Sequence, residues 1–73
     1  MKELIRLQTN VYNNVKRLCY LEDISSMRKF ETMCGLGRGY LKRCKNGKKN
    51  LTLATLIRMS NTLGVEVTEL LED

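Results

Sequence analysis

Apolar residues along most of this chain recur every three or four positions, which is the spacing of one face of an α-helix. Near the N-terminus they form a single stripe: Leu4, Leu7 or Gln8, Val11, Val15, Leu18, and Leu21 or Glu22. This stripe predicts one long first helix. A shorter helix beginning near Val11, capped by Thr9 or Asn10, fits the same pattern and leaves residues 1–8 as a separate turn or an extension.

Two short helices are predicted next, joined by a glycine-containing turn. Ser25 or Ser26 can cap a helix over residues 27–33, and Gly35 supplies the left-handed residue that ends it. The following helix runs from about 38 to 45 and stops at Asn46-Gly47. The predicted inward residues are Met27, Phe30 and Met33, then Leu41 and Cys44. In the turn between the helices, Leu36 plugs the corner and Gly37 caps the second of them.

Two more helices complete the pattern. Thr52 caps the longer one and Gly64 closes it, and Val65 and Val67 lead into a last short helix containing Leu70 and Leu71. The apolar face of the longer helix comprises Leu53, Leu56, Ile57, Met59, Ser60 and Leu63. The chain lacks proline and any alternating β-branched stretch, so the predicted class is all-α. The short turn after residue 33 is typical of a helix-turn-helix unit, although an unrelated αα-hairpin has the same spacing.

The length of 73 residues predicts a single domain over residues 1–73, with residues 1–10 as a candidate N-terminal extension. The net charge of +5 is unevenly distributed, because residues 26–50 carry +7 whereas residues 51–73 carry −3. A polarised surface of this kind steers an anionic partner to one face. A short helix with cations on its outer side suits the major groove of DNA.

The content of cysteine and histidine argues against a metal site, and the lack of histidine and of a clustered pair of acidic residues argues against an enzyme. Cys19, Cys34 and Cys44 show no Cys-x-x-Cys spacing, and the chain contains no histidine. A tetrahedral zinc site needs four good ligands, so buried free thiols are expected. A redox-sensing thiol is the alternative, with Cys44 favoured because neighbouring lysines would lower its pKa.

Charged residues interrupt the first apolar stretch, at Lys2, Glu3 and Arg6, so no signal peptide is predicted. No apolar run approaches the roughly 18 residues that a membrane span requires. We therefore expect a cytoplasmic protein that does not associate with membranes.

Residues 26–71, about two-thirds of the chain, resemble the phage repressor and Cro type of helix-turn-helix domain, also called the xenobiotic-response-element family. The matching positions form one ungapped frame: Ser26, Phe30, Gly35-Leu36, Leu41, Asn46-Gly47, Thr52-Leu53, Leu56-Ile57, Leu63-Gly64-Val65 and Leu70-Leu71. The resemblance implies a five-helix repressor-like DNA-binding domain in which helices two and three form the helix-turn-helix.

The chain departs from this family at two charged positions. Glu31 replaces the usual alanine that lets helices two and three approach closely, and Lys45 replaces a glutamate near the end of helix three. That glutamate typically pairs with an arginine of helix one, where this chain has Cys19, which cannot form the pair. We hypothesise that Glu31 and Lys45 interact instead.

The resemblance also implies that the start of helix three lies in the major groove. On this chain the residues presented there are Gly37, Arg38, Gly39, Lys42 and Arg43. Because arginine can donate two parallel hydrogen bonds to guanine O6 and N7, Arg38 and Arg43 are the predicted base readers. Gly39, one step inside the predicted helix, either lets the backbone approach the base edges or marks a frayed helix start.

A second set of residues is predicted to contact DNA phosphates: Met27, Arg28, Tyr40, Asn46, Lys48, Lys49 and Asn50. Met27 and Arg28 begin helix two, whose N-terminal amides suit a phosphate, with Met27 offering only its backbone. Tyr40 is either a phosphate donor, the preferred interpretation, or a ring packed along helix two. The loop residues would fix the register on DNA without reading its sequence.

These observations favour a sequence-specific regulator of transcription that binds double-stranded DNA, with no cofactor, metal or small-molecule ligand. A homodimer on DNA is expected, because two half-sites about one turn apart double the contact. The candidate dimer surfaces are residues 65–71 and the apolar start of helix one, with Leu4, Ile5 and Leu7. The alternative is an antitoxin-like or regulator-binding interaction module on which the basic face is incidental.

Overall fold

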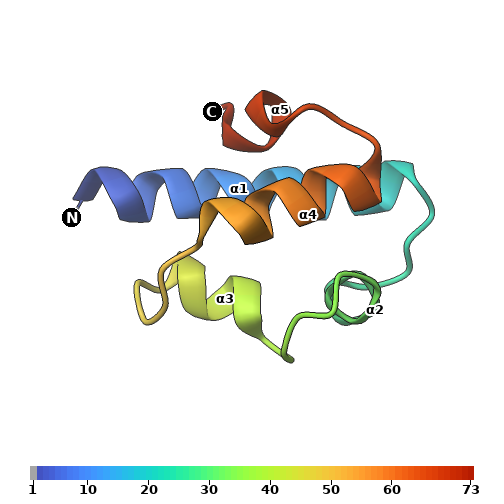
Figure 1. Ribbon diagram of the computed structural model, residues 1–73, viewed down its shortest axis with the longest axis horizontal. Coiled ribbons are helices and arrows are strands. Elements are labelled where there is room, and N and C mark those ends of the chain that lie inside the picture. The colour runs from blue at the N-terminus through green and yellow to red at the C-terminus, as the bar shows by residue number, and fades with distance from the viewer. Residues whose placement is uncertain (1) are drawn as a thin grey trace.

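The computed structural model describes residues 2–73 and contains five helices in that range (Figure 1). They are α1 (Lys2–Leu21), α2 (Met27–Met33), α3 (Tyr40–Lys45), α4 (Leu53–Leu63) and α5 (Val67–Leu71). The all-α class and the order of the helices are therefore confirmed. α1 lies along the long axis of the molecule, with α3 and α2 below it in Figure 1 and α5 above it.

The first helix is continuous, which resolves the alternative left open by the sequence. α1 passes through Thr9 and Asn10 without a break, and the Thr9 hydroxyl donates to the Ile5 carbonyl one turn earlier instead of capping a new helix. The buried residues of α1 are Gln8, Val11, Asn14, Val15, Leu18 and Cys19. The predicted stripe is wrong at its end, since Leu21 is 62% exposed.

The limits of α2 are as predicted. The Ser26 hydroxyl accepts a hydrogen bond from the Lys29 amide at 3.1 Å, and Gly35 has a φ of 72° just beyond the end of the helix. Its inward face is only partly as predicted: Phe30 is fully buried, but Met33 is 51% exposed. Met27 and Met33 lie about 120° apart around a helix axis, so one narrow core contact cannot cover both. The second buried residue of α2 is Glu31.

The start of α3 differs from the prediction. The helix begins at Tyr40 instead of Arg38, and Gly39, not Gly37, occupies the N-cap with a φ of 74°. This left-handed conformation costs glycine little but cannot be part of a right-handed helix. Residues 37–40 therefore form a turn, in which the Tyr40 amide donates to the Gly37 carbonyl at 3.1 Å. The prediction that Gly39 lies inside the helix is wrong.

Local signals also set the limits of α4. The Thr52 hydroxyl accepts from the Thr55 amide at the N-cap, and Gly64 closes the helix with a φ of 69°. The buried residues are Leu56, Met59, Ser60 and Leu63. The predicted apolar face is too wide, because Leu53 is 77% exposed and Ile57 is 50% exposed.

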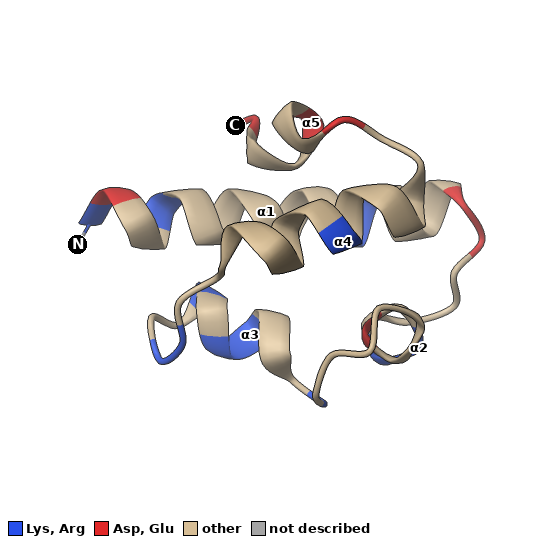
Figure 2. Cartoon of the chain, viewed as in Figure 1, with Lys and Arg blue, Asp and Glu red and all other residues tan. Residues whose placement is uncertain are grey.

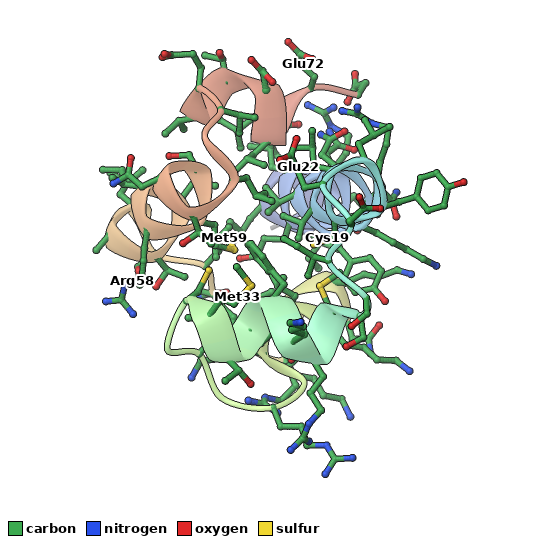
Figure 3. All side chains as sticks on the ribbon, turned by 90° about the vertical axis from the view of Figure 1, so that its right-hand side faces the viewer. Cys19, Glu22, Met33, Arg58, Met59 and Glu72 are labelled. Atoms are coloured by element: carbon green, nitrogen blue, oxygen red, sulfur yellow. The ribbon has the colours of Figure 1, made fainter. Side chains whose placement is uncertain are left out.

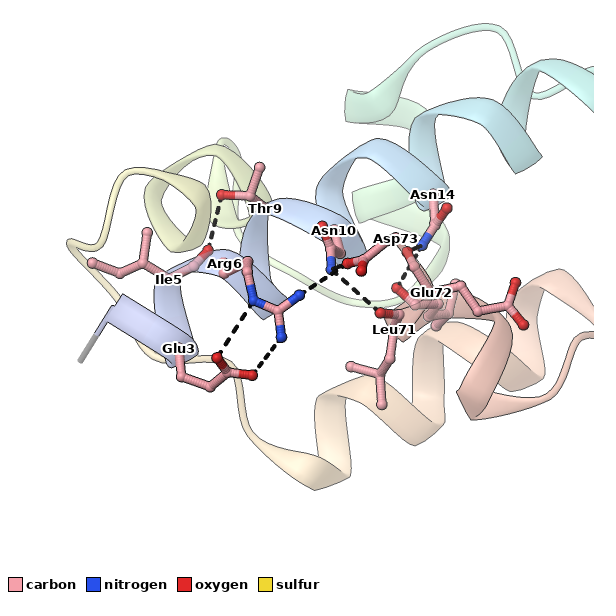
Figure 4. Close-up of polar contacts among 10 residues, drawn as sticks. Glu3, Ile5, Arg6, Thr9, Asn10, Asn14, Leu71, Glu72 and Asp73 are labelled. Carbon is pink, nitrogen blue, oxygen red and sulfur yellow. Dashed lines mark hydrogen bonds and ion pairs between the residues drawn. The ribbon is translucent and has the colours of Figure 1, made fainter.

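Two asparagines of α1 hold the C-terminal end of the chain (Figure 4). The Asn14 amide group donates to the carbonyls of Leu70 and Glu72, at 2.9 and 2.7 Å. Asn10 donates to the Asp73 carboxylate, which also pairs with Arg6 at 3.0 Å. These bonds satisfy carbonyls that the end of α5 leaves unpaired, and so fix α5 on α1.

The three cysteines are buried free thiols, as predicted. Burial raises the pKa of each thiol above its ordinary value. At Cys44 this desolvation outweighs the opposing effects of a hydrogen bond with Tyr40 and of the positive charges of Lys49 and Arg43. The hypothesis of a low-pKa redox thiol at Cys44 is therefore wrong.

Candidate nucleic-acid interface

Helices α2 and α3, joined by residues 34–39, form the helix-turn-helix unit predicted from the sequence (Figure 1). Leu36 is half-buried in the corner and packs against the core. On the other side of the turn, the Arg58 guanidinium of α4 donates to the Cys34 carbonyl at 3.2 Å. The turn is thus held by the core and by a neighbouring helix.

Glu31 makes the most specific contact between the two helices. Its side chain is buried, and its two carboxylate oxygens accept hydrogen bonds from the backbone amides of Gly39 and Leu41, at 3.0 and 3.1 Å. The first amides of a helix have no partner within the helix, and the helix dipole favours a negative charge beside them. Glu31 therefore caps α3 from the neighbouring helix.

This arrangement contradicts the hypothesis that Glu31 interacts with Lys45. The Lys45 ammonium group lies over the Tyr12 ring of α1, 4.7 Å from its centroid, in the range of a cation–π contact. The side chains at the two positions where the chain departs from the family therefore have different partners. Glu31 binds backbone amides, and Lys45 binds an aromatic ring.

The loop after α3 is held by Gln8 of α1, a residue that the sequence pattern offered only as an alternative to Leu7. Its buried amide donates to the carbonyls of Cys44 and Lys49, at 2.6 and 3.2 Å, and accepts from the Leu51 amide at 2.7 Å. The feature of the sequence that could have indicated this role is a polar residue at one position of the apolar stripe. Gln8 thereby fixes the end of α3 and both ends of the loop of residues 46–52, called the lysine-bearing loop because it carries Lys48 and Lys49.

The residues predicted to face DNA bases come together at the outer side of the turn and α3. Arg38, Lys42, Arg43 and Gly37 are exposed, and Gly39 is half-buried. The Arg43 guanidinium donates to the Arg38 carbonyl at 2.8 Å, so the Arg43 side chain reaches the backbone at the start of α3. Many nitrogen-tipped side chains extend from this end of the molecule, away from Glu72, which follows α5 (Figure 3).

Most of the predicted phosphate-contact residues are also accessible. Arg28, Asn46, Lys48, Lys49 and Asn50 are exposed, and Met27 is half-buried against the core. Tyr40 differs, because it is only 7% exposed, and the Lys49 ammonium group lies 5.5 Å from its ring centroid. This burial favours a packed ring for Tyr40, so we omit it from the proposed phosphate contacts.

The charges separate across the molecule as the sequence indicated. Basic residues cluster on α3 and the loop that follows it, whereas acidic residues mark α5 and the C-terminal end (Figure 2). An anionic rod approaching this surface would meet positive charge on the α3 side. Glu31, the acidic residue of this region, is buried and occupied by backbone amides.

Other kinds of site find little support in the part of the chain that the structure describes. Among residues 2–73 there is no group of three or more side chains that could hold a metal ion. No helix in the same range is long and apolar enough to span a membrane.

Comparison with known proteins agrees with this geometry. A helix-turn-helix family model matches residues 24–70, which include all of the α2–turn–α3 unit and α4. Neither the curated proteins nor the solved structures give a match. The family is one of DNA-binding regulators and is not typically enzymatic. Because the family model matches well over half of the chain, the chain belongs to the Cro/C1-type helix-turn-helix family.

Proposed function

We propose that this protein is a sequence-specific regulator of transcription, repressor-like and cytoplasmic, that places α3 in the major groove of double-stranded DNA. The observation that carries the proposal is the exposure of Arg38 in the turn and of Lys42 and Arg43 on α3, a short helix whose two ends are tied to α2 and α1. A rigidly held helix with cationic side chains meets both requirements of groove binding, which are a fixed register and donors for base edges.

The proposed base-reading residues are Gly37, Arg38, Gly39, Lys42 and Arg43. The two arginines would donate to guanine, and the two glycines leave the turn without side chains that would hold α3 away from the groove. The proposed phosphate contacts are Arg28, Asn46, Lys48, Lys49 and Asn50, with Met27 contributing its backbone. Base contacts would supply the sequence preference, and phosphate contacts would supply most of the salt-dependent affinity.

The direct test is selection of bound sites from a random duplex pool, followed by electrophoretic mobility shifts with the selected site. A regulator of the proposed kind should enrich one sequence motif and bind it more tightly than a random duplex of the same length. An interaction module with an incidental basic face should shift no duplex even at low salt, and that result would replace our proposal with the alternative.

Lys49→Ala is expected to weaken binding to selected and random duplexes equally, because a loop lysine contacts phosphate and not bases. The slope of log K against log salt should become less steep by about 0.9, the value for one phosphate contact. Arg6→Gln is the control, since it removes one positive charge from the region paired with the C-terminal Asp73. An unchanged slope for Lys49→Ala would exclude Lys49 from the interface.

We further propose that the protein binds DNA as a homodimer, with a groove between α1, α4 and α5 as the contact between copies. The groove has a volume of about 230 Å³ and is lined by Leu4, Leu7, Gln8, Val11, Leu51, Thr52, Leu53, Leu56 and Leu71. Leu53 stands at its edge and is 77% exposed. A twofold interface must be self-complementary, and a protruding leucine beside an apolar groove provides both halves of one.

Leu53→Glu is therefore expected to shift the protein toward monomer in sedimentation equilibrium and to reduce its affinity for a palindromic selected site. Burying one leucine is worth about 1.5–3 kcal/mol, and the dimer would lose this contribution twice. Leu21→Glu is the matched control, because Leu21 is an exposed leucine at the C-terminal end of α1 and lies outside the groove. If Leu53→Glu leaves the oligomeric state unchanged, this groove is not the dimer contact.

A further inference from the structure

One peptide group at the start of α3 is hydrogen-bonded on both sides. The amide of the Arg38–Gly39 peptide donates to the Glu31 carboxylate at 3.0 Å, and the carbonyl of the same peptide accepts from the Arg43 guanidinium at 2.8 Å. The buried carboxylate and the exposed guanidinium are therefore linked through a single peptide plane. Hydrogen bonds in such a chain polarise and strengthen one another.

Glu31 is one of the groups that hold this turn in its conformation. Gly39 has a left-handed φ of 74°, and glycine adopts alternative conformations at little cost. Rotation of the Arg38–Gly39 peptide would remove the amide from the carboxylate and the carbonyl from the guanidinium together. The second Glu31 oxygen, bound to the Leu41 amide at 3.1 Å, holds the carboxylate in register with α3. By binding the amide of this peptide, Glu31 restrains the direction in which the Arg38 carbonyl points.

Gly39 leaves space for the Arg43 guanidinium. A Cβ atom added at Gly39 would lie 3.3 Å from Arg43 Nη1, which is closer than an ordinary contact, whereas one added at Gly37 would lie at an ordinary 3.8 Å from Arg43 Nη2. The guanidinium carries five N–H donors in a fixed plane. The hydrogen bond from Nη1 to the Arg38 carbonyl restrains this plane before any ligand arrives.

We propose that Glu31 is a positioning residue for DNA sequence recognition, acting through the Arg38–Gly39 peptide to orient the Arg43 guanidinium toward a base edge. The inference rests on the proposed function and deepens it. A buried residue that never touches DNA would then contribute to the choice of sequence, because a side chain held in place loses less freedom when it binds.

The test is a double-substitution cycle on Glu31 and Arg43, read as the ratio of affinities for a wild-type-selected duplex and a random duplex of the same length. Glu31→Gln keeps the shape of the side chain but replaces one carboxylate oxygen with an NH2 group. This group cannot accept a hydrogen bond, so one of the two backbone amides loses its partner. We expect Glu31→Gln to lower the affinity ratio about tenfold, at the low end of one bidentate base contact, with little effect on random-duplex affinity. In an Arg43→Ala background the same substitution should have little further effect.

Stability is separated from positioning by a control. Asn14→Ala removes side-chain hydrogen bonds to the end of α5, far from the turn, and should lower the melting temperature without changing the affinity ratio. All affinities are measured where circular dichroism shows each variant to be folded. If Glu31→Gln leaves the ratio unchanged, or lowers it equally with and without Arg43, the proposal is overturned.

A readout that needs no DNA tests the link from its exposed end. Arg43→Ala is a surface substitution, so the fold should survive it even if the Glu31 variants do not fold. We expect it to shift the Gly39 amide resonance in NMR spectra, and Glu31→Gln to increase the mobility of the Arg43 side chain. An unmoved Gly39 resonance would refute the link. Failure of the wild-type protein to bind any duplex would instead refute the proposed function, and with it the role in recognition.

Discussion

Replacing Arg43 with alanine should weaken binding to the selected duplex by about 5- to 150-fold, the range of one bidentate arginine–guanine contact of about 1–3 kcal/mol. Affinity for random duplex should fall much less, because only the loss of one positive charge acts there. Arg43 is exposed and already oriented by the Arg38 carbonyl, which makes it the stronger of the two arginine candidates. Fluorescence anisotropy titrations with both duplexes measure the two losses.

Lys45→Ala is the matched control for Arg43→Ala. It removes one positive charge from the same helix, but the Lys45 ammonium group lies over Tyr12 on the side of α1 instead of beside the turn. The ratio of affinities for the two duplexes should be nearly unchanged by this substitution. Equal losses on selected and random DNA for Arg43→Ala would show that Arg43 acts as a point charge and reads no base.

Gln8→Ala should be among the most destabilising single substitutions outside the apolar core. It leaves the carbonyl of Lys49 and the amide of Leu51 without their partner, and it removes one of two hydrogen bonds to the Cys44 carbonyl, which also accepts from the Gly47 amide. Each buried polar group left unpaired costs about 1–3 kcal/mol, so a loss of at least about 2 kcal/mol is expected. For a domain of this size, that loss lowers the melting temperature by about 8–16 °C.

Thermal unfolding followed by circular dichroism measures this change, and Asn13→Ala provides the control. Asn13 lies on the exposed side of α1, where replacing asparagine with alanine slightly favours the helix. Because Gln8 also holds the lysine-bearing loop, Gln8→Ala should weaken DNA binding even at temperatures where the protein is folded. A melting temperature within 3 °C of the wild type, a shift of about 1 kcal/mol or less, would contradict this role.

The parts of the fold that follow from neighbouring residues could be predicted from the sequence. Ser26, Thr52 and Gly64 are local start and stop signals, and the structure places them at the helix ends where the pattern expected them. The exposure of Met33, Leu53 and Ile57 could not be predicted in the same way. The width of a buried face depends on how closely the partner helix approaches, and that is not a property of the helix itself.

The organisation of the candidate site depends on contacts between distant residues, which explains what sequence reasoning missed. Gln8 bonds to carbonyls 36 and 41 positions away, and Glu31 bonds to amides 8 and 10 positions away. Single-sequence patterns treat both as polar interruptions of an apolar face. The predicted start of α3 is wrong for the same reason, since the amide of the left-handed Gly39 is bound by a carboxylate from another helix.

The capping of α3 by a buried side chain has a consequence for how this protein can diversify. The groups that hold α3 in place lie inside the molecule, whereas Arg38, Lys42 and Arg43 project from its surface. Surface substitutions away from such supporting contacts usually change stability by no more than about 0.5 kcal/mol. Outer side chains that make no such contact, such as Lys42, can therefore be exchanged in evolution or in the laboratory, giving new target preferences on an unchanged frame.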